Sequence, residues 1–406
     1  MTEKRHPFKR SRRAAEVRGF GIDKTALAAD AVRSDWPVLR MENLDTDLPL
    51  PPEAVPETIS ALDHPASNSW LPFTGDMDLR AAISEFTEQR TGRRYDPASE
   101  IVVTSGGTSA ILDVLLATVD PGDEVLLTDP TYAGIVNRVR LAGGVPKLVP
   151  YRVEDGEWRL DLEAFAAAAA AKPAIAVLMS PSMPSGATLN SQEWDAVAAA
   201  LVEHDVPLLY DAAMERLLFD DRPLVHPVTL PGMAERTVIV GSLSKEHRMI
   251  GWRVGWVAGP AELVESVGWM HVYNTTMPTA LSRFPAAAVL RGDQAHVAEC
   301  VADLQARRDL ILDALQGWPV VKPGGGWSLL IDAIALGTTP PELSQALLAD
   351  AAIAATPMLG WGGEVADRHV RLVFSAESQE RLATLPDRFA GTRLEAYGSS
   401  PRTARA

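Results

Sequence analysis

Short apolar segments, each followed by turn residues and then by a helical segment, dominate the middle of the chain. Runs rich in Val, Ile and Leu cover residues 101–104, 124–128, 174–179, 207–210 and 237–240. Strands that are apolar throughout are typical of parallel sheets whose two faces are both covered by helices. The pattern therefore predicts an α/β fold with a doubly wound, mostly parallel sheet. In such sheets ligands bind at the carboxyl ends of the strands.

The pattern changes on either side of this region. Residues 39–52 form an extended, proline-rich passage, and apolar spacing predicts a helix around residues 79–86. After residue 287, a helix at Ala295–Leu315 and short strands at 327–331 and 369–374 predict a smaller α+β domain. We expect four parts: a flexible basic arm at 1–20, a small domain from 21–55 plus 290–396, a large domain at 56–289, and a disordered tail at 397–406.

Composition and charge narrow the class of protein. With 47% hydrophobic residues and a net charge of −15, the 406-residue chain is expected to be globular and not to bind nucleic acid. The single cysteine, Cys300, excludes an internal disulfide framework and a cysteine-based zinc site, and fits a reducing compartment. No apolar run reaches membrane-spanning length, and the basic opening lacks the apolar core of a secretory signal. We therefore expect a cytoplasmic protein without a membrane partner or a metal.

One segment concentrates reactive and charged side chains. Residues 241–256 read Gly-Ser-Leu-Ser-Lys-Glu-His-Arg-Met-Ile-Gly-Trp-Arg-Val-Gly-Trp and follow an apolar run, so Lys245 is held at the end of a buried strand. Ser242, Ser244 and Arg253 supply the donors and the positive charge that suit a phosphate. A lysine amine held beside them suits Schiff-base formation. The alternative is an ordinary loop that contains serine and lysine after a strand.

The pattern Ser-x-Ser-Lys-x5-Gly-x-Arg-x-Gly in this segment resembles the lysine segment of the class I/II aminotransferases. These are fold-type I enzymes that use pyridoxal 5′-phosphate (PLP), and the resemblance extends over about residues 35–395. It implies the PLP-transferase fold type I for the large domain and a homodimer whose sites take residues from both subunits. Lys245 would hold the cofactor covalently and move the proton of the substrate Cα. Asn274–Thr276 match the segment on the phosphate side that the two subunits share.

Further residues match cofactor-binding positions of this family. Gly106, Gly107 and Thr108 lie between a strand and a helix, where close backbone approach and free N–H groups suit the phosphate; an ordinary tight turn is the alternative. Tyr132 matches the aromatic residue that stacks on the pyridine ring, with a packed core tyrosine as the alternative. Asp211 matches the aspartate that pairs with the pyridine nitrogen, and a helix N-cap is its alternative.

Two residues match positions on the substrate side. Arg371, within the apolar segment 369–374, matches the arginine that binds the substrate α-carboxylate, because a guanidinium complements a planar carboxylate. A surface salt bridge is the alternative. Trp327, in Gly-Gly-Gly-Trp, matches a residue that lines the substrate side.

Three positions depart from the family pattern. Met183 replaces an asparagine that donates to the cofactor O3′ oxygen, and Met214 replaces a tyrosine that contacts the same oxygen. Trp70 replaces a tyrosine that reaches the phosphate of the partner subunit. A thioether cannot donate a hydrogen bond, so the usual support of O3′ is missing.

The resemblance implies a transferase of amino acid metabolism that moves an amino group between an α-amino acid and a 2-oxo acid. The two methionines keep open a PLP-dependent lyase, cyclase or oxidase that acts on an amino acid. A ligand-sensing regulator built on an aminotransferase-like domain is a third alternative, but residues 1–20 are too few for a helix-turn-helix unit before the PLP fold.

Overall fold

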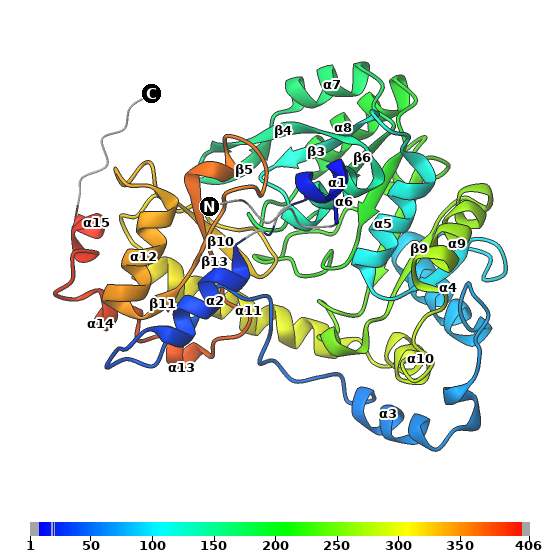
Figure 1. The fold of residues 1–406 in the computed structure, drawn as a ribbon, viewed down its shortest axis with the longest axis horizontal. Coiled ribbons are helices and arrows are strands. Elements are labelled where there is room, and N and C mark those ends of the chain that lie inside the picture. The colour runs from blue at the N-terminus through cyan, green and yellow to red at the C-terminus, as the bar shows by residue number, and fades with distance from the viewer. Residues whose placement is uncertain (1–7, 18, 20, 400–406) are drawn as a thin grey trace.

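A computed structural model describes residues 8–17, 19 and 21–399, and a large central sheet is its main feature (Figure 1). Among the described residues, this sheet has eight strands in the order β2-β9-β8-β7-β6-β3-β4-β5. Their bounds are β2 Ile101–Thr104, β3 Glu124–Asp129, β4 Val145–Glu154, β5 Glu157–Leu160, β6 Ile175–Leu178, β7 Leu208–Asp211, β8 Thr237–Ser242 and β9 Gly255–Ala258.

The strand directions place most carboxyl ends on one edge of this sheet. β4, β3, β6, β7 and β8 are mutually parallel neighbours. β9 is antiparallel to both β8 and β2, so β2 points the same way as β8, while β5 returns antiparallel to β4. The predicted α/β fold with a mostly parallel sheet is confirmed. The apolar runs did not predict β4, β5 or β9.

Helices cover both faces of the central sheet, which explains why its strands are apolar throughout. Successive side chains of a strand alternate between the faces. Val102 packs with α5, α6 and α9, whereas its neighbours Ile101 and Val103 pack with the cluster that contains α4, α7, α8 and α10. The bounds are α4 Met77–Thr91, α5 Gly107–Thr118, α6 Ala133–Ala142, α7 Leu162–Ala170, α8 Ser191–Glu203, α9 Ala261–Thr275 and α10 Arg283–Arg291.

The C-terminal third of the chain builds a second group of elements, together with an N-terminal segment. β10 Ser328–Asp332, β13 His369–Val373 and β12 Thr356–Pro357 form an antiparallel sheet, and β1 Leu39–Arg40 pairs in parallel with β11 Ile353–Ala354. In Figure 1 the blue helix α2 (Ile22–Ala31) lies among these orange and red elements, and it contacts β11. The other helices here are α11 Ala295–Ala314, α12 Pro340–Ala351, α13 Gln379–Leu382, α14 Leu385–Phe389 and α15 Glu395–Ser399.

Short elements complete the chain. They are α3 Ala54–Leu62 and the 3-10 turns η1 Pro65–Asn68, η2 Pro227–Thr229, η3 Ile250–Trp252 and η4 Ala366–Arg368. Within the stretch that was expected to be a flexible arm, residues 12–16 form the helix α1 (Arg12–Glu16), because the Ser11 hydroxyl accepts a hydrogen bond from the Ala14 N–H and α1 contacts α6. Residues 1–7, 18, 20 and 400–406 lie outside the described residues. No helix in the described part of the chain is long and apolar enough to cross a membrane.

Candidate active site

Most of the predicted cofactor-binding residues lie at or just after the carboxyl ends of β2, β3, β7 and β8, which run in the same direction, and they meet at one cavity of about 210 Å3. Of the residues predicted from the sequence, this cavity is lined by Gly107, Thr108, Tyr132, Asp211, Ser242, Ser244, Lys245 and Arg253. Three further predicted residues lie next to them: Gly106 is close to Arg253, Trp327 contacts Lys245, and the charge of Arg371 acts on Lys245. The fold therefore gathers the predicted cofactor side and the predicted substrate side in one place.

Lys245 follows β8 and carries an amine that is only partly protonated at neutral pH. Burial and, to a smaller extent, the charge of Arg371 lower its pKa from the ordinary 10.5 to about 7. The carboxylate of Asp211 acts in the opposite direction. The Nζ atom lies 4.1 Å from the centroid of the Trp327 ring, on which the amine rests. About half of such amines are uncharged, and so nucleophilic, at pH 7.

Asp211 is the last residue of β7 and only 5% of its surface is exposed. Its Oδ1 atom accepts a hydrogen bond of 3.1 Å from the Ala213 N–H. Burial raises the pKa of this carboxyl to about 6, against the lowering effects of that N–H group and of Lys245. A buried carboxylate of this kind gains from a cationic partner.

One end of the cavity is built for an anion; we call Gly106, Gly107, Thr108, Ser242, Ser244 and Arg253 the anion cradle. α5 begins at Gly107, and the first N–H groups of a helix have no partner within it. Gly106 has a φ of 89°, and a Cβ atom there would lie 2.4 Å from Nη2 of Arg253. A Cβ atom on Gly255 would lie 2.4 Å from the Gly106 and Gly107 backbone. Gly255 therefore allows the close approach of β9 to the cradle, and Gly106 leaves room for the Arg253 guanidinium.

The serines of the cradle and Arg253 are joined by hydrogen bonds. The Ser242 hydroxyl accepts a hydrogen bond of 3.1 Å from the Ser244 N–H. Nη1 of Arg253 donates to the Ile250 carbonyl at 3.0 Å and to the Ser244 hydroxyl at 3.4 Å. These two hydrogen bonds use only Nη1, so the exposed guanidinium has further N–H groups that can donate to an anion in the cradle.

Tyr132 stands at the start of α6 and its ring packs edge-on against Trp361, with centroids 5.9 Å apart. The Thr131 N–H donates to the Trp361 carbonyl at 2.9 Å. Two residues earlier, the Asp129 carboxylate accepts hydrogen bonds from the N–H groups of Val365 at 2.9 Å and Ala366 at 3.0 Å. The end of β3 therefore holds the segment that leads into β13.

Arg371 lies in β13, and its side chain is fully buried. One nitrogen, Nη2, donates to the Glu42 carbonyl and to the Thr356 hydroxyl, and the guanidinium lies 4.5 Å from the centroid of Trp361. The Nε and Nη1 atoms have no hydrogen-bond partner among the described residues. Burial lowers the pKa of Arg371 to about 9. A surface salt bridge is therefore excluded, and two buried donors remain for a ligand.

Met183 and Met214 line the same cavity and are both buried. Two nearby hydroxyl groups that could replace them, those of Tyr210 and Ser185, make other hydrogen bonds. The Tyr210 hydroxyl donates to the Ser180 carbonyl at 3.3 Å, and the Ser185 hydroxyl accepts from the Ala187 N–H at 3.2 Å. In the described structure neither Tyr210 nor Ser185 lines the cavity.

The segment predicted to lie at a subunit boundary is close to the cradle helix. Asn274 donates to Oδ1 of Asp113 at 3.0 Å, and the Thr275 hydroxyl lies 3.4 Å from that of Ser109. Asp113 and Ser109 both belong to α5, which begins at the cradle. Trp70 is 73% exposed and packs against Phe73.

Sequence analysis missed several residues at this site. Leu44, Ile111, Met179 and Ile250 line the cavity without a distinctive sequence signal. Arg138 was missed as well: it lies on α6 and donates to the Thr108 carbonyl in the cradle at 2.7 Å. The one available signal was an arginine among the buried apolar residues of that helix.

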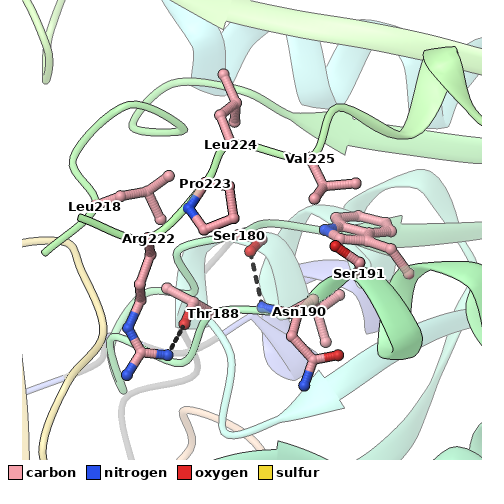
Figure 2. A pocket seen from close by; sticks show the side chains of 11 residues that line it. Ser180, Thr188, Asn190, Ser191, Leu218, Arg222, Pro223, Leu224 and Val225 are labelled. Atoms are coloured by element: carbon pink, nitrogen blue, oxygen red, sulfur yellow. Dashed lines mark hydrogen bonds between the residues drawn. The ribbon is translucent and has the colours of Figure 1, made fainter. Parts of the chain in front are cut away.

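A second cavity, of about 170 Å3, lies away from these residues (Figure 2). Figure 2 shows the Arg222 side chain turned towards Thr188, to which it donates at 3.2 Å. Arg222 also pairs with Glu157. None of the residues predicted from the sequence to form the site is among the described residues that line this cavity. Its arginine is already paired, so we place the chemistry at the Lys245 cavity.

Comparisons with known proteins agree with this geometry. Residues 39–389 match the family described as "Aminotransferase class I and II". An aspartate aminotransferase of Pyrococcus abyssi is 32% identical over 80% of this chain and 83% of its own length. Aromatic-amino-acid aminotransferase 2 of Thermococcus litoralis is 29% identical over 83% of this chain and 87% of its own length. The solved structure of N-succinyldiaminopimelate aminotransferase from Mycobacterium tuberculosis superimposes with a TM-score of 0.87 at 28% identity, covering 94% of this chain and 99% of that one. The chain therefore belongs to the aminotransferase class I and II family and is a PLP-dependent amino-acid aminotransferase of fold type I.

Proposed function

We propose that this protein binds PLP through Lys245 and uses it to move an amino group between an α-amino acid and a 2-oxo acid. The observation that carries the proposal is the set of side chains that line one cavity. It combines a lysine with a pKa of about 7, a buried aspartate and an anion cradle.

The residues present fit this cofactor. The cradle presents helix N–H groups, serine hydroxyls and Arg253, which suit a phosphate. Asp211 is a buried carboxylate whose raised pKa would fall beside a protonated pyridine nitrogen. The Tyr132 ring lines the cavity and suits stacking on an aromatic ring. When bound, PLP supplies an electron sink for negative charge at the substrate Cα.

The remaining steps are assigned to side chains of this chain. Arg371 binds the substrate α-carboxylate through its free Nε and Nη1 donors. Trp327 forms a wall beside Lys245 that orients the substrate and excludes water. Lys245 removes the Cα proton, a role that suits an amine with a pKa near the working pH.

We also propose a cytoplasmic homodimer with a large domain at 56–289 and a small domain from 21–55 plus 290–396. Large apolar side chains are exposed around Asn274–Thr276, the segment that the two subunits are predicted to share and that we call the crossover segment: Phe73 is 47%, Trp269 53% and Tyr273 84% exposed. Side chains of this size normally mark an interaction surface when they gather. The buried, free Cys300 supports a reducing compartment.

Product analysis with single amino acids tests the proposed reaction. Purified protein loaded with PLP is incubated with each amino acid, with and without 2-oxoglutarate or pyruvate. Formation of the matching 2-oxo acid, with stoichiometric amination of the added 2-oxo acid, is expected. Ammonia, a cyclised product or consumption of oxygen would instead support the lyase, cyclase or oxidase that the buried Met183 and Met214 keep open.

A further inference from the structure

Arg138 reaches from α6 into the anion cradle. Its Nε donates to the carbonyl of Thr108 at 2.7 Å, and its Nη1 donates to the carbonyl of Gly134 at 2.8 Å. Its guanidinium is also hydrogen-bonded to the side chain of Tyr132. One side chain thus joins the first turn of α5, the first turn of α6 and the ring predicted to stack on the cofactor.

Gly134 makes this arrangement possible. A Cβ atom at Gly134 would lie 2.4 Å from Cε1 of Tyr132 and 2.9 Å from Nη1 of Arg138. The tyrosine ring therefore folds back over the start of its own helix, into space that any larger residue would fill. We call Tyr132, Gly134 and Arg138 the α6 clamp.

We propose that Arg138 is a positioning residue that fixes the Tyr132 ring relative to the anion cradle, so that ring and cradle present one rigid surface to the cofactor. This inference rests on the proposed use of PLP. A stacking ring contributes most when it is already held in place, because ordering it on binding would cost conformational entropy. Two hydrogen bonds to carbonyl groups fix the planar guanidinium of Arg138, and its hydrogen bond to Tyr132 then restricts rotation of the ring before the ligand binds.

Arg138 also acts on Asp211 through its charge. Burial raises the pKa of Asp211 to about 6, whereas the Ala213 N–H, Lys245 and Arg138 lower it and Glu215 raises it. Removing the charge of Arg138 therefore raises this pKa further. Because an ionised Asp211 is the form that pairs with a protonated pyridine nitrogen, PLP affinity should decrease as Asp211 becomes protonated at low pH. We call this decrease the acid limb of binding, and it should move to higher pH when the charge of Arg138 is removed.

Measurements of PLP affinity and of the induced circular dichroism of bound PLP can show whether Arg138 positions the Tyr132 ring or only fills space. Cofactor-free protein is titrated with PLP between pH 5 and 8.5, with tryptophan fluorescence as the readout of Kd, and the visible dichroism of the loaded protein is recorded. For R138Q we expect Kd to rise about tenfold, since a charged hydrogen bond is lost. We also expect its visible dichroism to fall and its acid limb to shift upward. R138K keeps the charge, so its acid limb should stay in place while the dichroism still falls.

Two further variants guard against a trivial loss of folding. G134A should lower the dichroism by displacing the ring, and it should remain folded because alanine favours a helix over glycine. R140Q is the matched control on the same helix: Arg140 faces the outer groove beside α1, and its variant should behave as the parent does. Far-UV dichroism and the Tm of each cofactor-free variant report on folding.

The outcomes separate this inference from the proposed function. If the parent protein fails to bind PLP, the proposed function is wrong. If the parent binds PLP, and folded R138Q and G134A match its Kd and visible dichroism, the clamp has no positioning role and only this inference is overturned. If PLP binding by R138Q and by R138K is lost over the same acid pH range, the charge of Arg138 does not act on Asp211.

Discussion

The amine of Lys245 lies over the face of Trp327, with 4.1 Å between Nζ and the ring centroid. An indole face attracts a charged amine, whereas burial and the charge of Arg371 favour the neutral one. The resulting pKa of about 7 lets the same nitrogen attack a carbonyl when neutral and carry a proton when charged.

The first prediction concerns the site of cofactor attachment. Borohydride reduction of the loaded protein, followed by peptide mapping, should place the pyridoxyl group on Lys245. Because its pKa is about 7, the rate of attachment should rise between pH 6 and 8 and then level off, whereas an ordinary lysine would still gain at pH 10. A label on an exposed lysine such as Lys322, or a rate that climbs past pH 9, would contradict this assignment.

The second prediction concerns the substrate carboxylate. Arg371→Ala should retain PLP and lose about 1.5–3 kcal/mol of amino-acid binding, which is roughly 10- to 150-fold in Kd, because a charge-assisted hydrogen bond is lost. Arg368→Ala is the matched control, since Arg368 lies just before the same strand but pairs with Asp332 at the surface. Spectral titration with amino acids measures both, and equal affinities for the two variants would remove Arg371 from the site.

The third prediction gives Asp211 opposite effects on stability and on function. Its folded pKa of about 6 exceeds the ordinary 3.8, so the protonated side chain stabilises the cofactor-free fold, and that contribution is lost as the pH rises from about 4 through 6. Asp211→Asn should therefore stabilise cofactor-free protein at pH 7, by about 3 kcal/mol at most, and leave it unchanged near pH 4. PLP affinity should fall in the same variant. Denaturant unfolding at the two pH values tests the first part, and a loss of stability at pH 7 would refute it.

The fourth prediction follows from the methionines of the cavity. Without a donor to O3′, the nitrogen that joins Lys245 to the cofactor should stay protonated to higher pH than in relatives that have such donors. The double variant Met183→Asn, Met214→Tyr should lower the pKa of this nitrogen by about 1.5 units, if each of the two donors contributes roughly 1 kcal/mol. The pH dependence of the visible spectrum measures it. An unchanged titration would mean that the methionines only fill space.

The fifth prediction concerns assembly. Sedimentation at micromolar concentration should show a dimer, and replacing exposed Trp269 and Tyr273 with serine should weaken it by removing apolar contact area. Leu27→Ser is the control, because Leu27 is 70% exposed on α2, far along the chain from the crossover segment. A stable, active monomer of the parent protein would require a complete site within one chain.

Sequence patterns predicted the parts of the fold that depend on burial. β6, β7 and β8 are buried at every position, so their apolar runs stand out in the sequence. β4 begins with alternating exposed and partly buried residues, ends with three exposed ones and contains two prolines, so only Val149 and Tyr151 are buried and no continuous apolar run marks the strand. β9 begins within the lysine segment, at Gly255, and its antiparallel placement depends on the close approach of Gly255 to the cradle backbone.

The site was predicted where residue type alone carries the chemistry, as with Lys245, Asp211 and Arg371. What sequence could not supply is the pairing of individual atoms. The two free donors of Arg371 depend on which nitrogen the Glu42 carbonyl occupies, and the contact of Arg138 with Thr108 depends on how α5 and α6 approach each other. Such contacts join residues far apart in the chain, so local spacing contains no record of them.

The hydrogen bonds from the Val365 and Ala366 N–H groups to Asp129 have a mechanical consequence. They attach residues 361–366 to the end of β3, although the chain places this segment directly before β13. If the two sheets move relative to each other, Trp361 should travel with the central sheet while Arg371 travels with the smaller one. The chain would then have to bend on both sides of this segment, between the end of β12 at Pro357 and Trp361 and again within η4, and exchanging this loop between relatives would require the carboxylate at position 129 to move with it.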